Sequence, residues 1–464
     1  MRILPALCAF VLAASPLSLS QAFAAMPPLK ETDLALPFAA LLENKTLQAV
    51  SVAVIQPGGT TTAHLGLLAP NRAVAPDDHT LYEIGSISKV FTSLLLAEAV
   101  VRGELTLDTP VADLLPSDVN LPNSAAQRIT VRMLATHTSG LPSLPPEIPP
   151  DNFANPYARY AEADLWQTLR QVKLDFEPGT SAAYSNLAAG LLGTLLARRA
   201  HTTYAELLAA RITKPLGMEE TMIAIPETLR PRFAPPFTSA GELWTPWEFQ
   251  ALAGAGGIRS SLADMKRFAA AILRPADTPL QKAIELSWTR QELAKTFAPG
   301  GQALGWMLAG DGRTRWHNGM TGGFHAALFV NRELGLASVL LSNRSTPIGT
   351  ELAAGLMQKA AGLPERPIPN RDRAEIAVTT EQLDRCVGTF QVTPQFSLVC
   401  ERRNQALFVT PTGQSTDRLY AASPTTFFSR RAPADLAFDL PAEGGPATAV
   451  ILKQAGRELR GTRQ

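Results

Sequence analysis

A polar, proline-rich segment at residues 364–375 (PERPIPNRDRAE) divides the chain into two parts with different sequence patterns. Such a composition is typical of a linker between domains. The chain has 464 residues, which is too long for a single compact core. The sequence therefore predicts a larger domain at residues 25–363, a linker at 364–375 and a smaller domain at 376–464.

The larger domain begins and ends with strand patterns. Val50–Ile55 and Thr60–Leu65 flank a Pro-Gly-Gly turn, which predicts a β-hairpin. The apolar run from Ile87 to Val101 favours a buried helix, and short strands return from Thr314–His317 to Ala337–Leu341. We therefore expect an α+β fold, in which helices flank one mostly antiparallel sheet and form a separate lobe.

The smaller domain contains short apolar segments with turn residues at regular spacing, which predicts a small all-β sandwich or barrel. Cys386 and Cys400 lie in this part. An even pair of cysteines in an exported protein favours a disulfide, and the alternative is two buried free thiols. Both alternatives stay open, because a bridge also requires suitable geometry.

The first 24 residues have the features of a secretory signal peptide. Arg2 gives a positive start, Ile3–Ala14 is mostly apolar, and Ala22-Phe23-Ala24 is a small-x-small cleavage site. The apolar run is too short to span a bilayer, which disfavours the alternative of a membrane anchor. No later segment is long enough either. The sequence predicts cleavage near Ala24 and export to the periplasm.

Charge and motifs exclude several classes of function. The net charge is +1 and no basic stripe is present, so nucleic acid is not an expected partner. The chain lacks a His-Glu-x-x-His motif, a cysteine cluster and a complete dinucleotide fingerprint. We therefore expect neither a metal nor a cofactor, and a small molecule or peptide as the substrate.

Ser86 and Lys89 are three residues apart at the head of the predicted apolar helix. This spacing places both side chains on one helix face. A serine hydroxyl needs a neighbouring base to become a nucleophile, and a buried lysine with a lowered pKa is one. A Ser-x-x-Lys match on its own is weak, since one is expected by chance in a chain of this length.

Two further motifs strengthen this interpretation. Tyr184-Ser185-Asn186 offers a phenol for proton transfer and an amide for binding substrate, although a tyrosine packed beside a helix cap is the simpler alternative. His317 ends a predicted strand, and Asn318, Gly319 and Met320 follow it. The N–H of Met320 is a candidate oxyanion-hole donor together with that of Ser86. The alternative is a glycine-rich turn with a solvent-facing histidine.

Taken together, these motifs resemble those of the serine β-lactamase and DD-peptidase superfamily, most closely its class C β-lactamase branch. That branch also holds penicillin-binding proteins, D-aminopeptidases, DD-carboxypeptidases and esterases. The resemblance covers residues 50–343. It is carried further by three phrases, LTLDTP at 105–110, ITVRMLATHTSGLP at 129–142 and PLGM at 215–218. The smaller domain is similar, more loosely, to the lipocalin-like barrel of some members, in which Cys386 and Cys400 would lie on neighbouring strands.

The resemblance implies a role for each motif residue. Ser86 would be acylated, Lys89 would share its proton, and Tyr184 would be the general base. Asn186 would bind the substrate amide, and His317 to Gly319 would form the third motif. Class C β-lactamases usually have lysine at the position of His317, so the departure puts the substrate in doubt and leaves the nucleophile intact. His137 is expected to be structural.

Three hypotheses follow from these motifs. The first is a serine hydrolase of the bacterial envelope that cleaves amides, namely D-amino-acid peptides of the cell wall and β-lactams. The second is a short-chain ester hydrolase on the same scaffold. The third is a non-catalytic protein that binds penicillin or peptidoglycan. The intact set of Ser86, Lys89 and Tyr184 argues against the third.

Overall fold

The structure is a computed structural model that describes residues 27–464, except 149–153, 275–276, 366, 368–369, 395, 413–415, 431 and 455. The predicted signal peptide, residues 1–24, lies outside the described residues. The chain forms two compact units. The larger unit contains most residues up to Glu365, and the smaller contains 366–464 with two short segments, Ala39–Thr46 and Ser239–Glu242.

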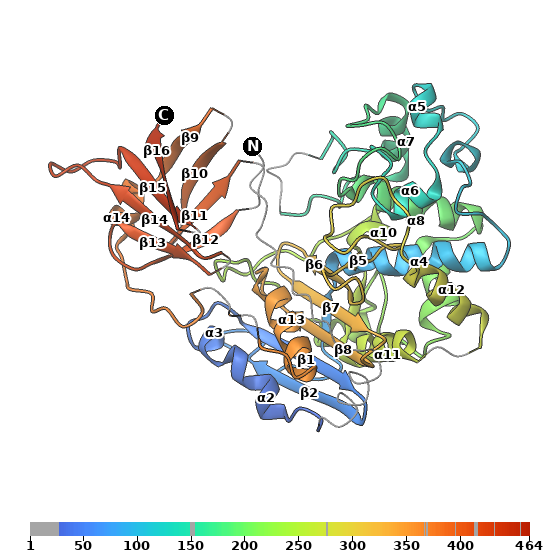
Figure 1. Cartoon of the computed structure of the whole chain (residues 1–464), viewed down its shortest axis with the longest axis horizontal. Helices are drawn as coiled ribbons and strands as arrows, with labels where there is room; N and C mark the ends of the chain where they lie inside the picture. The colour runs from blue at the N-terminus through green and yellow to red at the C-terminus, as the bar shows by residue number, and fades with distance from the viewer. Residues whose placement is uncertain are drawn as a thin grey trace. The chain divides into compact units, whose positions relative to one another are not determined.

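The larger unit is built on a sheet in which every neighbouring pair of strands is antiparallel (Figure 1). The strand order is β2-β1-β8-β7-β6-β5. The first and last strand groups of the unit therefore meet at the pairing of β1 with β8, where Val52 lies opposite Leu340. The strands are β1 Ala49–Gln56, β2 Gly59–Gly66, β5 Met307–Leu308, β6 Arg315–Met320, β7 His325–Asn331 and β8 Leu336–Ser342, and a separate pair is β3 Leu81–Glu83 and β4 Arg259–Ser261.

Helices cover both faces of this sheet and form a lobe beside it (Figure 1). The longer helices are α4 Ser88–Val101, α7 Glu162–Gln171, α8 Asn186–Arg199, α11 Leu262–Leu273, α12 Pro279–Trp288 and α13 Ile348–Ala360. The shorter ones are α2 Glu31–Ala35, α5 Ser124–Gln127, α6 Val131–Ala135, α9 Tyr204–Leu208, α10 Ala253–Gly256 and the 3-10 turn η2 Gly85–Ile87, whereas α3 Ala39–Glu43 and α14 Thr380–Arg385 belong to the smaller unit. Among the described residues, no helix is both long and apolar enough to cross a membrane.

The two faces of the sheet pack against different helices. Ala326 and Leu328 of β7 belong to the main apolar core together with Phe268 of α11. On the opposite face, Gly349 of α13 lies against His325 and Leu340 with no room for a Cβ. Because alternate residues of a strand face opposite sides, neighbouring residues of β6 also point to different environments. This separation decides which of the motif residues reach a common site.

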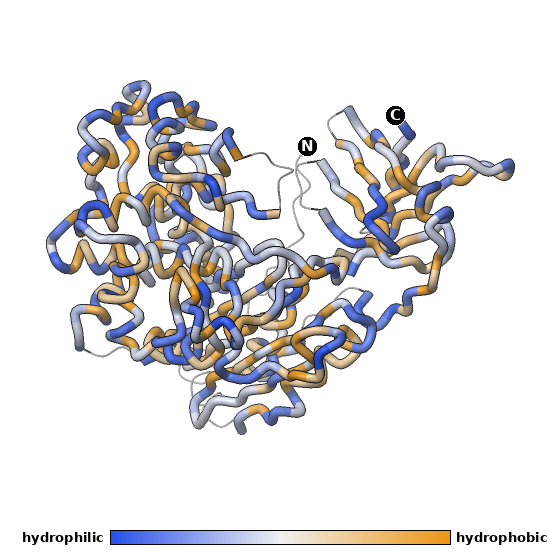
Figure 2. The backbone as a smooth tube through the Cα atoms, turned by 180° about the vertical axis from the view of Figure 1, so that it is seen from behind, coloured by the Kyte–Doolittle hydropathy of each residue, from blue (hydrophilic) through white to orange (hydrophobic). Residues whose placement is uncertain are grey.

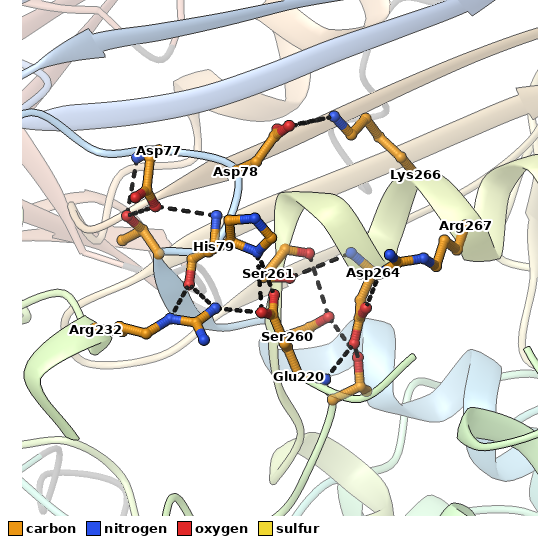
Figure 3. A network of polar contacts seen from close by, with 12 residues as sticks. Asp77, Asp78, His79, Glu220, Arg232, Ser260, Ser261, Asp264, Lys266 and Arg267 are labelled. Carbon is orange, nitrogen blue, oxygen red and sulfur yellow. Dashed lines mark hydrogen bonds and ion pairs between the residues drawn. The ribbon is translucent and has the colours of Figure 1, made fainter. Parts of the chain in front are cut away.

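A polar network holds the segment before β3 against α11 (Figure 3). Asp78 accepts a hydrogen bond from Lys266 at 2.8 Å, and His79 pairs with Glu220 at 3.0 Å. The fully buried Asp264 accepts the backbone N–H of Glu220 at 2.7 Å. Strand β3 ends just before the Gly85 turn, so this network fixes the approach of the chain to Ser86.

The smaller unit contains a closed barrel, whose eight strands all belong to the described residues. Of the two predicted alternatives, a sandwich and a barrel, the barrel is confirmed. Burial alternates from residue to residue along β14. Figure 2, which is coloured by hydropathy, shows both hydrophobic and hydrophilic residues in the barrel strands. These strands are β9 Gly388–Thr393, β10 Phe396–Arg403, β11 Ala406–Pro411, β12 Asp417–Ala421, β13 Thr426–Ser429, β14 Ala434–Asp439, β15 Ala449–Gln454 and β16 Arg457–Arg463.

The cysteines of the barrel differ from the favoured expectation. Cys386 follows α14, and Cys400 lies in β10 opposite Gly388. Both side chains are buried in the apolar core of the barrel, and both are free thiols, not the expected disulfide. The Cys386 thiol donates to the carbonyl of Gln382 at 3.6 Å. Burial raises the pKa of Cys386 to about 12 and also raises that of Cys400, so neither is a reactive thiolate.

Candidate active site

Ser86 lies in η2, at the point where the chain turns from β3 into α4. Every other residue from Leu81 to Ala99 is buried, whereas Ser86 is partly exposed. Gly85 has φ +51°, in the left-handed region that glycine adopts readily. The turn therefore presents one hydroxyl at the end of a buried helix, where the helix N-terminus favours negative charge.

Lys89 is 1% exposed, and its Nζ lies 3.0 Å from Ser86 Oγ. The same nitrogen donates to the carbonyl of Ala255, just after the start of α10, at 2.6 Å. Burial lowers the pKa of Lys89 well below its usual value. The lowered pKa favours the neutral amine, which is the form of lysine that is able to take the proton of Ser86.

Tyr184 comes from the segment before α8, whose N-cap is Ser185. The Tyr184 ring centre is 4.7 Å from Lys89 Nζ, and its hydroxyl interacts with Ser86, which lowers the pKa of Tyr184. Burial raises the pKa of Tyr184 above its usual value, more than the contact with Ser86 lowers it. The raised pKa favours the neutral phenol of Tyr184 in the free enzyme, and the role of Tyr184 as general base stays a prediction.

His317 is buried in β6, in contrast to the alternative of a solvent-facing side chain. Its Nδ1 lies 2.6 Å from the carbonyl oxygen of Asn318, so Nδ1 carries a proton and donates it. The ring centre is 6.3 Å from that of Tyr184. Burial, followed by the charge of Lys89, lowers the pKa of His317 to about 3. The imidazole is therefore neutral at physiological pH.

The two motif asparagines lie in different places. Asn186 is partly exposed next to Tyr184, and its Nδ2 donates to the hydroxyl of Tyr157 at 3.3 Å. Asn318 points to the opposite face of the sheet from His317, where its Nδ2 donates to Thr350 of α13 at 3.0 Å. Strand β6 continues to Met320, beyond the predicted end at His317. Because successive side chains of a strand point to opposite faces, the Asn318 side chain is turned away from the face that carries His317.

Gly319 brings β6 into backbone contact with the turn that carries Ser86. A Cβ added at Gly319 would lie 1.9 Å from the carbonyl oxygen of Ile84 and 2.8 Å from the nitrogen of Ser86. A Cβ added at Gly85 would lie 2.7 Å from the nitrogen of Met320. The amide nitrogens of Ser86 and Met320 therefore lie at one contact, which is suited to stabilising a negative oxygen.

The sequence did not predict that His137, Tyr157 and Phe297 would lie beside Tyr184. The His137 ring centre is 4.6 Å from that of Tyr184, and the Phe297 ring centre is 6.2 Å from it. These residues come from distant loops, so no local spacing indicates the contact. The one available signal was that His137 belongs to a phrase shared with the resembled superfamily. Among the described residues, no group of three or more metal-ligating side chains occurs at this site or elsewhere.

Comparisons with known proteins concern mainly the larger unit. The family model described as Beta-lactamase matches residues 37–361, and the barrel lies outside the match. The chain is 28% identical over 344 residues to a Beta-lactamase of Pseudomonas fluorescens, covering 66% of this chain and 91% of that protein. It is also 28% identical to Penicillin-binding protein 4 of Amycolatopsis lactamdurans, with 70% and 89% covered. Identity is 32% over 210 residues to the D-alanyl-D-alanine-carboxypeptidase/endopeptidase AmpH of Escherichia coli K12, covering 44% and 51%.

Proposed function

The chain belongs to the beta-lactamase family of serine hydrolases, and on that premise we propose that it cleaves amide bonds of D-amino-acid cell-wall peptides or β-lactams through an acyl-enzyme on Ser86. The observation that carries the proposal is the buried amine of Lys89, which lies 3.0 Å from the partly exposed Ser86 hydroxyl. The names of two relatives, a D-alanyl-D-alanine-carboxypeptidase and a penicillin-binding protein, support this substrate class.

The proton moves in two steps. The neutral amine of Lys89 takes the proton of Ser86 as Oγ attacks the carbonyl carbon of the substrate. The Tyr184 phenol then donates its proton to the leaving nitrogen and regains one from the Lys89 ammonium. Water enters in place of the leaving group, and the reverse transfers release the acyl group and restore Ser86.

Ser86, Met320 and Asn186 also hold the substrate. The N–H groups of Ser86 and Met320 stabilise the oxygen that becomes negative in the tetrahedral intermediate. Asn186, partly exposed beside Tyr184, donates to the substrate amide. The N-terminal signal pattern supports export to the periplasm, where cell-wall peptides are available.

A second candidate is a short-chain ester hydrolase, which two features of the site favour. Burial and the charge of Lys89 lower the pKa of His317 to about 3, so this imidazole, unlike a lysine, is no cation for a substrate carboxylate at neutral pH. Met320 is 43% exposed and Phe297 is 37% exposed, and both adjoin the site residues. An uncharged substrate with an apolar acyl group is suited to such surroundings.

Replacing His317 with lysine is expected to raise kcat/KM for benzylpenicillin about tenfold or more relative to p-nitrophenyl butyrate. A cation at this position adds a charge-assisted hydrogen bond to the penicillin carboxylate, which contributes about 1.5–3 kcal/mol. His317→Gln, which stays neutral, is the matched control and should leave the ratio near that of the natural protein. Equal ratios of kcat/KM for the two substrates in the lysine and glutamine variants would contradict the claim that position 317 faces the substrate carboxylate.

The natural protein should show no titration of this ratio between pH 5 and 8. His317 has a pKa of about 3, so it is charged only below that pH and is neutral throughout the range. Steady-state kinetics on both substrates across the range measures this directly.

The proposed function itself is tested by intact-mass spectrometry of the mature protein with benzylpenicillin, sampled over time while the drug is quantified. A lasting adduct on the peptide that contains Ser86 indicates a penicillin-inhibited peptidase. Loss of penicillin without a lasting adduct indicates a β-lactamase. If neither occurs, and short acyl esters also leave Ser86 unmodified, the acyl-enzyme proposal is wrong and the non-catalytic alternative replaces it.

A further inference from the structure

The position of the Tyr184 side chain depends on how the backbone around it is held, because Tyr184 lies in no helix or strand. Tyr184 lies one residue before the N-cap of α8 and is not part of that helix. Its hydroxyl contacts Ser86, the group that it serves in the proposed reaction. Other groups must therefore fix the chain at residues 183–185 if the phenol is to stay at the distance that proton transfer requires.

His137 contacts that chain on both sides of Tyr184. The backbone N–H of Ala183 donates to the carbonyl oxygen of His137 at 3.0 Å. The backbone N–H of Ser185 donates to His137 Nδ1 at 3.1 Å. Between these two bonds, the His137 ring lies over the Tyr184 ring, with centres 4.6 Å apart and planes tilted by 31°. One residue thus holds the tyrosine through two backbone bonds and one ring contact.

The conformation and protonation of His137 suit this role. Its φ is +58°, an uncommon value for a residue with a side chain, and the residue is buried. Nδ1 accepts a hydrogen bond, so the ring proton lies on Nε2. Burial, followed by the charges of Lys89 and His317, lowers the pKa of His137 well below its usual value. The ring stays neutral, which keeps Nδ1 available as an acceptor.

We propose that His137 is a positioning residue that holds Ala183 and Ser185 and so sets the distance between the Tyr184 hydroxyl and Ser86. The inference rests on the proposed function, because it concerns the efficiency of the acylation step on Ser86. His137 acts through Tyr184 and takes no part in binding the substrate. Its loss should therefore slow acylation and leave the apparent dissociation constant of the substrate nearly unchanged.

His137→Ala removes the side-chain acceptor and the ring, and is expected to slow acylation about 10- to 100-fold, the cost of a small misplacement of a proton-transfer group. His137→Asn is the rescue variant. Asparagine tolerates positive φ, and its Oδ1 accepts a hydrogen bond from about the position of Nδ1. The asparagine variant should regain most of the lost rate. His201, an exposed histidine with φ +53°, provides matched control variants, His201→Ala and His201→Asn, with acylation rates equal to the natural protein.

The experiment measures the acylation rate of each variant with p-nitrophenyl acetate by stopped flow, with the Ser86 adduct counted by mass spectrometry. A merely structural role would reduce the melting temperature and the number of Ser86 sites that react, while each reactive site kept its natural rate. Equal rates per reactive site in the alanine variant, or no rescue by asparagine, would overturn the inference alone. If the natural protein forms no adduct on Ser86, the proposed function fails, and the inference that rests on it fails as well.

Discussion

Replacing Ser86 with alanine is expected to reduce kcat/KM by at least about a thousandfold for any substrate that the natural protein turns over, since the bond-forming atom is lost. The fold should be preserved. Ser86 is partly exposed, and removing its hydroxyl leaves Lys89 Nζ bound to the Ala255 carbonyl at 2.6 Å. Steady-state kinetics, together with the melting temperature of each variant, measures both quantities.

The control for this variant is Ser117→Ala, at an exposed serine of the larger unit, which should keep full activity. The variant also has a qualitative signature. No mass adduct should form with benzylpenicillin or an ester, even though both still reach the site. Activity of the Ser86→Ala protein above about one per cent of the natural rate would refute the proposal of an acyl-enzyme on Ser86. Among the described residues, Ser86 has the side-chain hydroxyl that is hydrogen-bonded to Lys89 Nζ.

The sequence predicted the parts of the site that depend on local spacing. Ser86 and Lys89 are one helical turn apart, so any helix that starts there brings them together, and Nζ indeed lies 3.0 Å from Oγ. The antiparallel sheet was equally predictable from the two groups of strand patterns. Its pairing of β1 with β8 follows because both groups must bury their apolar residues in one layer.

The burial of individual side chains and the register of the strands could not be predicted from the sequence. Burial raises the pKa of the Tyr184 phenol above its usual value, and no sequence motif records that burial. Asn318 was grouped with His317 by adjacency, yet adjacent residues of a strand face opposite sides, and Asn318 reaches Thr350 instead. His137 reaches Ser185 across 48 positions of the chain, a contact that only the tertiary fold creates. The cysteine pair was likewise undecided until its geometry was known.

Replacing Gly319 with alanine is expected to have the second largest effect, about a hundredfold or greater loss of kcat. The added Cβ would lie 1.9 Å from the Ile84 carbonyl oxygen and 2.8 Å from the Ser86 nitrogen, so two backbones must separate. That separation moves the amides of Ser86 and Met320 apart, and the negative oxygen loses one of its two donors. The nucleophile and its base both lie on the η2–α4 segment, so Lys89 should still contact Ser86.

Gly355→Ala in α13 is the matched control, because nothing lies within 4 Å of the added Cβ. It should keep full activity and gain about 0.5–1 kcal/mol of stability, since alanine loses less entropy than glycine in a helix. Thermal unfolding and kinetics of both variants separate the two effects. If β6 and the Ser86 turn form the oxyanion hole, kcat per folded molecule of the Gly319→Ala protein should be reduced at the assay temperature. If its activity falls only in proportion to the unfolded fraction, the contact is structural, and the oxyanion donors must be sought away from Met320.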